Sequence, residues 1–218
     1  MTWPLWPFFD LAVRTPLLEL RYATDELLAA AALVHAEGVV PPGTEPFDGD
    51  ATFYGDAPEA QRKWLLGHWR ARAKTSPEWW HLAFAVMVGG EVVGMQDITG
   101  VDFVRLRTVS SFSFLGLRHQ RHGIGKEMRA AVVHLAFNGL GALRAESDAF
   151  DDNRGSRGVS ESLGYEPNGT VLAPRPSGAA LMHRHLLTRE RWLATGRRDD
   201  IEIDGLKPCL AIIGLEPA

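Results

Sequence analysis

The 218-residue chain contains little cysteine, no strong excess of either charge and no long apolar run. Its one cysteine, Cys209, excludes an intramolecular disulfide framework and is typical of a reducing cytoplasm. The formal net charge of -4 lacks the basic excess of nucleic-acid-binding domains. No stretch approaches the roughly 20 apolar residues that span a bilayer. These absences predict a cytoplasmic protein that partners neither nucleic acid nor membrane.

The amino-terminal stretch is apolar but lacks the basic segment of a secretory signal, and prolines and Asp10 interrupt it. Its Trp and Phe side chains favour self-association, so we expect a homo-oligomer. The pairs Trp79-Trp80 and Trp64/Trp69 are more typical of a core or a subunit interface than of a substrate box. No His/Cys/Asp cluster has the spacing of a metal site, which predicts no metal cofactor.

Hydrophobic periodicity predicts one domain over residues 1–218, with a core at about 17–188, an amino-terminal arm 1–16 and a carboxyl-terminal tail 196–218. The expected strands are 17–22, 81–88, 91–98, 104–117, 143–149, 165–173 and 179–188. The expected helices are 24–37, 58–75, 123–138, 153–163 and 190–194. Hairpins and crossovers in this order predict an α/β (α+β) fold, with one mixed β-sheet flanked by helices.

The most informative segment runs from Phe114 to Met128. An apolar run leads into a polar turn that holds Gly123 and Gly125, and an amphipathic helix begins at once. Such a strand-turn-helix junction presents free backbone N–H groups and the positive end of the helix dipole to an anion. Side chains at the two glycine positions would keep a ligand away from the backbone. The segment therefore predicts a site for a phosphorylated cofactor.

Two common phosphate-binding patterns fail at this segment. The P-loop requires Ser or Thr after Gly125-Lys126, where the chain has Glu127. The dinucleotide-binding fingerprint requires a third glycine or alanine, where the chain has Met128. A lone Gly-x-Gly is weak evidence, so a second motif is needed.

The turn Gln120-Arg121-His122-Gly123-Ile124-Gly125 matches Gln/Arg-x-x-Gly-x-Gly/Ala, and here the chain resembles the GNAT acyltransferases, whose loop of this form binds the coenzyme A pyrophosphate. A second match follows at the expected distance: Asn153-Arg154-Gly155-Ser156, then Leu163-Gly164-Tyr165. The form of the second motif with serine at position 156 is similar to that of the branch that contains the ribosomal-protein N-terminal acetyltransferases. The surrounding sequence resembles an actinobacterial-type subgroup in which at least one member uses succinyl-CoA.

The resemblance implies a single-domain fold whose mixed sheet is mostly antiparallel and splayed. It also implies acyl transfer from acetyl-CoA or succinyl-CoA to an amine by direct attack. The amine can belong to a small molecule, a peptide N-terminus or a lysine. The implied roles are a pyrophosphate cradle from 121 to 126, a strand edge at 114–117 that pairs with pantetheine, and Asn153 beside the pantetheine arm. The implied cofactor-binding residues are Phe114, Leu115, Gly116, Leu117, Gln120, Arg121, His122, Gly123, Ile124, Gly125, Lys126, Asn153 and Ser156.

Catalytic residues follow less directly. Many family members carry a tyrosine that protonates the leaving thiolate, and Ser160 stands at that position here. The candidates for the base that deprotonates the amine are Asp97, Glu146 and, on the face of Glu146, Asp148. The catalytic residues that we expect are Ser160, Asp97 and Glu146. The alternative for Ser160 is a hydroxyl on the helix surface, and the alternative for Asp97 and Glu146 is a solvated carboxylate.

Two further expectations concern specificity. A succinyl donor needs a cation for its carboxylate, and the candidates are Arg107, Arg175 and Arg184. The Pro/Gly-rich loop 38–56 is expected to border the acceptor groove, with a solvated connector as the alternative. Because the tyrosine is missing, a coenzyme A-binding sensor or structural subunit without turnover is the alternative to an enzyme.

Overall fold

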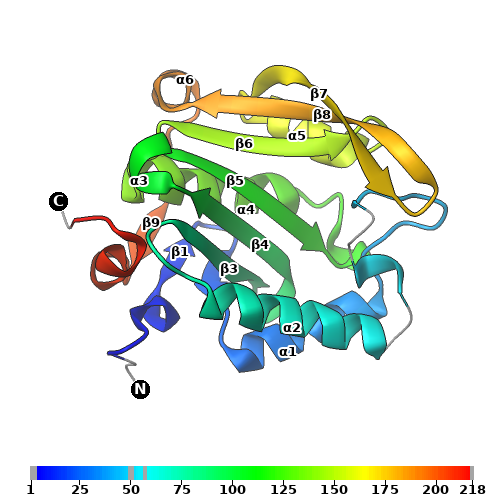
Figure 1. Cartoon of the computed structure of the whole chain (residues 1–218), viewed down its shortest axis with the longest axis horizontal. Coiled ribbons are helices and arrows are strands. Elements are labelled where there is room, and N and C mark those ends of the chain that lie inside the picture. The colour runs from blue at the N-terminus through cyan, green and yellow to red at the C-terminus, as the bar shows by residue number, and fades with distance from the viewer. Residues whose placement is uncertain (1–3, 49–51, 56–57, 217–218) are drawn as a thin grey trace.

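The computed structural model describes residues 4–48, 52–55 and 58–216. In this part of the chain, nine strands form one sheet in the order β7-β8-β6-β5-β4-β3-β2-β1-β9 (Figure 1). Every neighbouring pair is antiparallel except β5 and β6, which are parallel. The predicted mixed, mostly antiparallel sheet is confirmed. The strands are β1 (Ala12–Arg14), β2 (Glu19–Tyr22), β3 (Trp79–Val88), β4 (Glu91–Val101), β5 (Thr108–Leu115), β6 (Arg144–Phe150), β7 (Glu166–Arg175), β8 (Gly178–Thr188) and β9 (Glu202–Asp204).

Helices cover both faces of the sheet (Figure 1). One apolar cluster joins α1 and α2 to residues such as Met95 and Phe114, and a larger cluster joins α4 to the opposite face. None of the helices in the described ranges has the length and apolar character that a membrane crossing requires. The helices are α1 (Asp25–Glu37), α2 (Glu59–Ala73), α3 (Phe103–Leu106), α4 (Ile124–His134), α5 (Arg154–Ser162) and α6 (Arg189–Thr195).

Local signals explain most helix boundaries. The Thr24 hydroxyl accepts a hydrogen bond from Leu27 N and begins α1. The Asn153 side chain does the same for α5 through Ser156 N at 3.1 Å. Helix α4 ends earlier than the predicted 138, because a π-helical turn, Leu135–Gly139, follows it.

The predicted strand 104–117 is wrong at its start. Residues Phe103–Leu106 form the single turn α3, and Arg107 then adopts a left-handed backbone with φ of 48°. The Arg107 carbonyl accepts hydrogen bonds from Leu143 N and Arg144 N, which connects this turn to the start of β6. The strand β5 therefore begins only at Thr108.

The parallel pairing of β5 and β6 is short. It runs from Thr108↔Arg144 to Ser110↔Glu146, although β6 continues to Phe150 and β5 to Leu115. On its other side β5 remains paired with β4 up to Leu115. The sheet therefore splits after Ser110.

The core extends beyond the expected 17–188 in both directions. Strand β1 pairs with β2 and β9, and the side chains of Phe8, Val13, Cys209 and Ile213 are fully buried. Phe8 stacks on Tyr22 with ring centroids 5.4 Å apart. Trp6 and Phe9 are partly buried against the same core, which weakens the argument that linked the amino-terminal aromatics to self-association. Residues 1–3 of the predicted arm lie outside the described residues.

The carboxyl-terminal segment should thus contribute to stability as core. We expect Ile213→Ala to lower the free energy of unfolding by about 2–4 kcal/mol, because it removes a fully buried side chain and leaves a cavity. The matched control is Leu193→Ala on α6, whose side chain is 46% exposed and whose loss should cost little. Urea unfolding of both variants makes the measurement, and equal losses would contradict a packed tail.

Candidate active site

A cavity of about 720 Å³ lies between the diverging ends of β5 and β6, with α4 and α5 on one side and the loop after α1 on the other. Nine of the residues implied by the sequence line it. These are Phe114, Leu115, Gln120, Arg121, Gly123, Gly125, Lys126, Asn153 and Ser156. The two motifs, about 30 residues apart in the sequence, therefore form one site.

The amino terminus of α4 opens into this cavity. Gly123 is its N-cap, with φ of 81°, and no side chain of the described residues caps the helix. A left-handed backbone favours glycine here. Arg121, with φ of 66°, and Lys126 line the same end of the cavity. Unpaired N–H groups, the helix dipole and two cationic side chains make this end suited to phosphates.

Four implied residues do not line the cavity. Gly116 donates its N–H to Val93 O at 3.0 Å, and Leu117 donates to Gly38 O at 3.0 Å. Ile124 belongs to the core, and His122 is exposed. Their cofactor roles stay predictions, whereas the observed hydrogen bonds of Gly116 and Leu117 hold the loop in shape.

Gln120 connects the phosphate end of the cavity to the loop after α1. Its Nε2 donates to the carbonyls of Val39 and Leu115, each at 3.0 Å. Both acceptors belong to residues that line the cavity. A side-chain amide can donate to carbonyls of two separate chain segments, which explains why glutamine suits this position.

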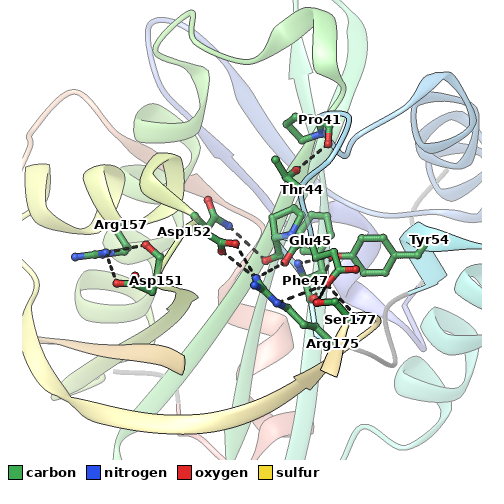
Figure 2. A network of polar contacts seen from close by, with 12 residues as sticks. Pro41, Thr44, Glu45, Phe47, Tyr54, Asp151, Asp152, Arg157, Arg175 and Ser177 are labelled. Carbon is green, nitrogen blue, oxygen red and sulfur yellow. Dashed lines mark hydrogen bonds and ion pairs between the residues drawn. The ribbon is translucent and has the colours of Figure 1, made fainter. Parts of the chain in front are cut away.

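The loop 41–48 closes one wall of the cavity and is held by the β7–β8 hairpin. Figure 2 shows Arg175 between Asp152 and Glu45, with Ser177 beside Glu45. Arg175 Nη1 lies 2.9 Å from Asp152 Oδ2, and its Nε lies 3.5 Å from Glu45 Oε2. The Ser177 hydroxyl donates to Glu45 Oε2 at 2.5 Å. Within the predicted loop 38–56, positions 49–51 and 56 lie outside the described residues.

Asp97 lies away from the cavity lining. Its Oδ2 is 3.0 Å from His81 Nε2, and His68 from α2 completes a cluster of three possible ligand atoms within 4.8 Å of one another. Burial lowers the pKa of His68, so this ring is neutral near pH 7. The sequence spacing of these residues gave no sign of the cluster, because α2, β3 and β4 bring them together only in the fold.

Glu146 and Asp148 point to the same face of β6 but differ in their surroundings. Glu146 lies at the last position of β6 that pairs with β5, between Arg144 and Arg184. Asp148 lies past the split and lines the cavity. Burial raises the pKa of the Asp148 carboxyl, and the positive charge of Arg184 opposes this shift. Sequence periodicity could not distinguish the surroundings of Glu146 from those of Asp148, because it does not show where the pairing of β6 with β5 ends.

Ser160 is fully buried and does not line the cavity. Its hydroxyl donates to Ser147 Oγ at 3.4 Å, and Ser147 Oγ also accepts from Arg129 Nη1 at 2.7 Å. Arg129 itself lines the cavity. Sequence reasoning missed Arg129, although its position one helical turn after Gly125 placed it on the same side of α4.

The comparisons with known proteins agree with this geometry. A family model described as "Acetyltransferase (GNAT) domain" matches residues 18–166. Among solved structures, Mycobacterium smegmatis RimJ in complex with CoA-disulfide is 19% identical, with a TM-score of 0.63, over 88% of this chain and 97% of that chain. A GCN5-related N-acetyltransferase from Brucella melitensis is also 19% identical, with a TM-score of 0.60, over 84% and 80%.

A third solved structure is RimL, a ribosomal L7/L12 alpha-N-protein acetyltransferase in complex with coenzyme A. It is 15% identical, with a TM-score of 0.63, over 80% of this chain and 95% of that chain. At these identities the three structures support the fold and not a shared acceptor.

The ion pairs of Arg175 with Glu45 and Asp152 provide a test of how the cavity wall is held. We expect Arg175→Met to cost about 1–2 kcal/mol of stability and to speed amide hydrogen exchange in 41–48, because Glu45 and Asp152 lose their shared partner. Arg105→Met is the matched control. Arg105 lies in α3 and pairs with Asp102, the residue just before that helix, and its side chain is 82% exposed. Unchanged exchange in 41–48 would show that the ion pairs do not hold the loop.

Proposed function

We propose that this chain, which belongs to the acetyltransferase (GNAT) family, transfers an acyl group from coenzyme A to an amine by direct attack on the thioester. The observation that carries the proposal is the continuous cavity from the amino terminus of α4 to the split between β5 and β6. Phosphates fit the first end, and the second end exposes strand backbone. A phosphorylated carrier with an extended amide-containing arm matches both ends.

The cofactor arm fits along β5. From Leu115 to Ser111 the strand runs about 13 Å, at roughly 3.3 Å per residue, and both residues line the cavity. The β5 edge beyond Ser110 has no β6 partner, so N–H and C=O groups on this edge are available to the amides of pantetheine. The carbonyls of Phe112 and Leu115 already accept hydrogen bonds from Gln96 and Gln120. The thioester then lies near Ser111 and Phe112. Holding the thioester and the amine in line supplies much of the rate enhancement.

Asp148 is the base that we favour. It lines the cavity near the split, and its raised pKa suits a group that must accept a proton from an ammonium. In the reaction the amine nitrogen forms a bond to the acyl carbon, the C–S bond breaks, and the bonding electrons leave on sulfur. The ammonium loses one proton to Asp148 before the attack, and Asp148 passes this proton to solvent. A second proton leaves the nitrogen for solvent as the tetrahedral intermediate collapses.

The acyl group is acetyl or succinyl. Of the three arginines considered for a succinyl carboxylate, Arg175 and Arg184 are already paired with carboxylates. Arg107 packs over the Phe103 ring and does not line the cavity. These contacts argue against a carboxylate site at any of the three and favour the smaller acetyl group there.

The acceptor side combines rings with negative charge. Phe47 and Phe112 line the cavity with ring centroids 5.4 Å apart, and Asp148 and Asp152 line it as well. An amine that carries an apolar neighbour, on a small molecule, a peptide N-terminus or a lysine, complements this surface.

Substitution of the phosphate loop tests the cofactor assignment. Gly125→Val should weaken coenzyme A binding at least 100-fold, because a Cβ at Gly125 already contacts Val159 and Leu115 at 3.7 and 3.8 Å and a larger side chain enters the cavity. Gly67→Val, on the exposed side of α2 with no atom near its Cβ, is the control. Isothermal titration with coenzyme A measures both, and equal affinities would refute the assignment.

Turnover separates an enzyme from a sensor. We expect thiol release from acetyl-CoA or succinyl-CoA when the protein is incubated with a panel of primary amines. Tight coenzyme A binding without acylation of any amine would favour the sensor.

The pH dependence tests Asp148. Because its pKa is raised, the rate should fall as pH drops through that pKa, and Asp148→Asn should lose this acidic limb and about 100-fold in kcat. A carboxyl whose folded pKa is raised destabilises the protein once it ionises. Asp148→Asn should therefore be at least as stable as the parent at neutral pH. Asp199→Asn, at an exposed carboxylate paired with Arg197, is the control, and an unaltered limb in Asp148→Asn would exclude this base.

A further inference from the structure

Arg129 is a buried cation without a carboxylate partner. Its side chain is 4% exposed and lines the cavity from the second turn of α4. Its Nη1 donates to Ser147 Oγ at 2.7 Å, and its Nε is buried without a hydrogen-bond acceptor. Among the described residues no carboxylate oxygen forms an ion pair with it, whereas Arg175, Arg184 and Arg198 all have such partners.

An arginine in this position costs several kcal/mol in lost hydration unless an opposite charge compensates it. The groups packed around Arg129 do not provide one. Ser147 and Ser160 are neutral hydroxyls, and the Tyr165 hydroxyl is buried, with a pKa that burial raises and the charge of Arg129 opposes. A ligand that becomes negative in the cavity would supply the missing charge.

The position of Ser147 locates the guanidinium along the cavity. Ser147 directly follows Glu146, the last residue of β6 that pairs with β5, so the guanidinium lies at the inner end of the split. Successive residues of a strand point to opposite faces. Asp148 is therefore on one side of β6 and the Arg129–Ser147 pair on the other.

We propose that Arg129 is a catalytic residue that pairs with the sulfur of coenzyme A as the C–S bond breaks. The inference rests on the proposed function and extends it to the leaving group. As the nitrogen–carbon bond forms, the electrons of the C–S bond move onto sulfur, and the guanidinium stabilises the resulting thiolate. The thiolate takes a proton from solvent when the product leaves. Ser147 and Ser160 are positioning residues that hold the guanidinium in place.

The direct test is the titration of the coenzyme A thiol while it is bound. Ultraviolet absorbance of the thiolate, recorded against pH in the saturated complex, should give a thiol pKa at least one unit below that of free coenzyme A. Arg129→Met should return the pKa to the free value or above it. Arg154→Met removes a cation from the α5 end of the same cavity, and should weaken binding without moving the thiol pKa.

Kinetics provide a second readout. Arg129→Met should lower kcat about 100-fold with a small change in KM, because the interaction forms only as charge develops on sulfur. Arg129→Lys should recover part of both kcat and the pKa shift, since it keeps the charge. If Arg129→Met does not fold, Ser147→Ala, which removes a single oxygen, should raise the bound thiol pKa and lower kcat by smaller amounts.

Two outcomes would overturn the proposal. One is an unshifted thiol pKa in the parent complex, or the same shift in parent and Arg129→Met. The other is a loss confined to succinyl-CoA in Arg129→Met, which would mean that the guanidinium binds a carboxylate of the acyl chain. Either result leaves coenzyme A binding and acyl transfer intact, so failure here is distinct from failure of the proposed function.

Discussion

The early end of the pairing between β5 and β6 is the constraint on which the site depends. Three residue pairs join the two strands, and past Ser110 and Glu146 each strand has a free edge. A free edge inside a protein leaves unsatisfied N–H and C=O groups, which is unfavourable unless a ligand or water pairs with them. The site is therefore an interruption of the sheet, and the ligand that we propose, an extended carrier with amides, would complete it.

Helix α4 places positive charge at two positions along this interruption of the sheet. Its first turn, at Gly123 to Lys126, presents positive partial charge, and its second turn carries the buried Arg129. Both lie on the side of the helix that faces the cavity, because positions 125 and 129 are one turn apart. One rigid element thereby determines the distance between the phosphate end and the end where the sheet splits. The loop 41–48, held by Arg175, forms the opposite wall.

Much of this was available from the sequence, and the failures have physical causes. The succession of strands along the chain and the caps at Thr24 and Asn153 follow from periodicity and local hydrogen bonding. The two cofactor motifs follow from the resemblance to the GNAT family. The three-residue strands β1 and β9 were not predicted, since three residues carry no usable period. The end of the β5–β6 pairing also left no local signal. Consequently Asp148 could not be distinguished from Glu146, and Arg129 went unnoticed.

The alternation of side chains along β6 places the proposed base and the proposed cation on opposite faces of the strand. Amide formation from an amine and a thioester needs proton removal at nitrogen and stabilisation of negative charge at sulfur. A cation on the same face as these carboxylates pairs with them, since Arg184 lies 3.5 Å from Glu146 Oε2 and 3.8 Å from Asp148 Oδ1. Asp148 and Ser147 instead point to opposite faces of the strand, and Ser147 holds Arg129 at 2.7 Å. The strand keeps the two charges apart across the plane of the sheet, so that each is available to a different atom of the reacting group.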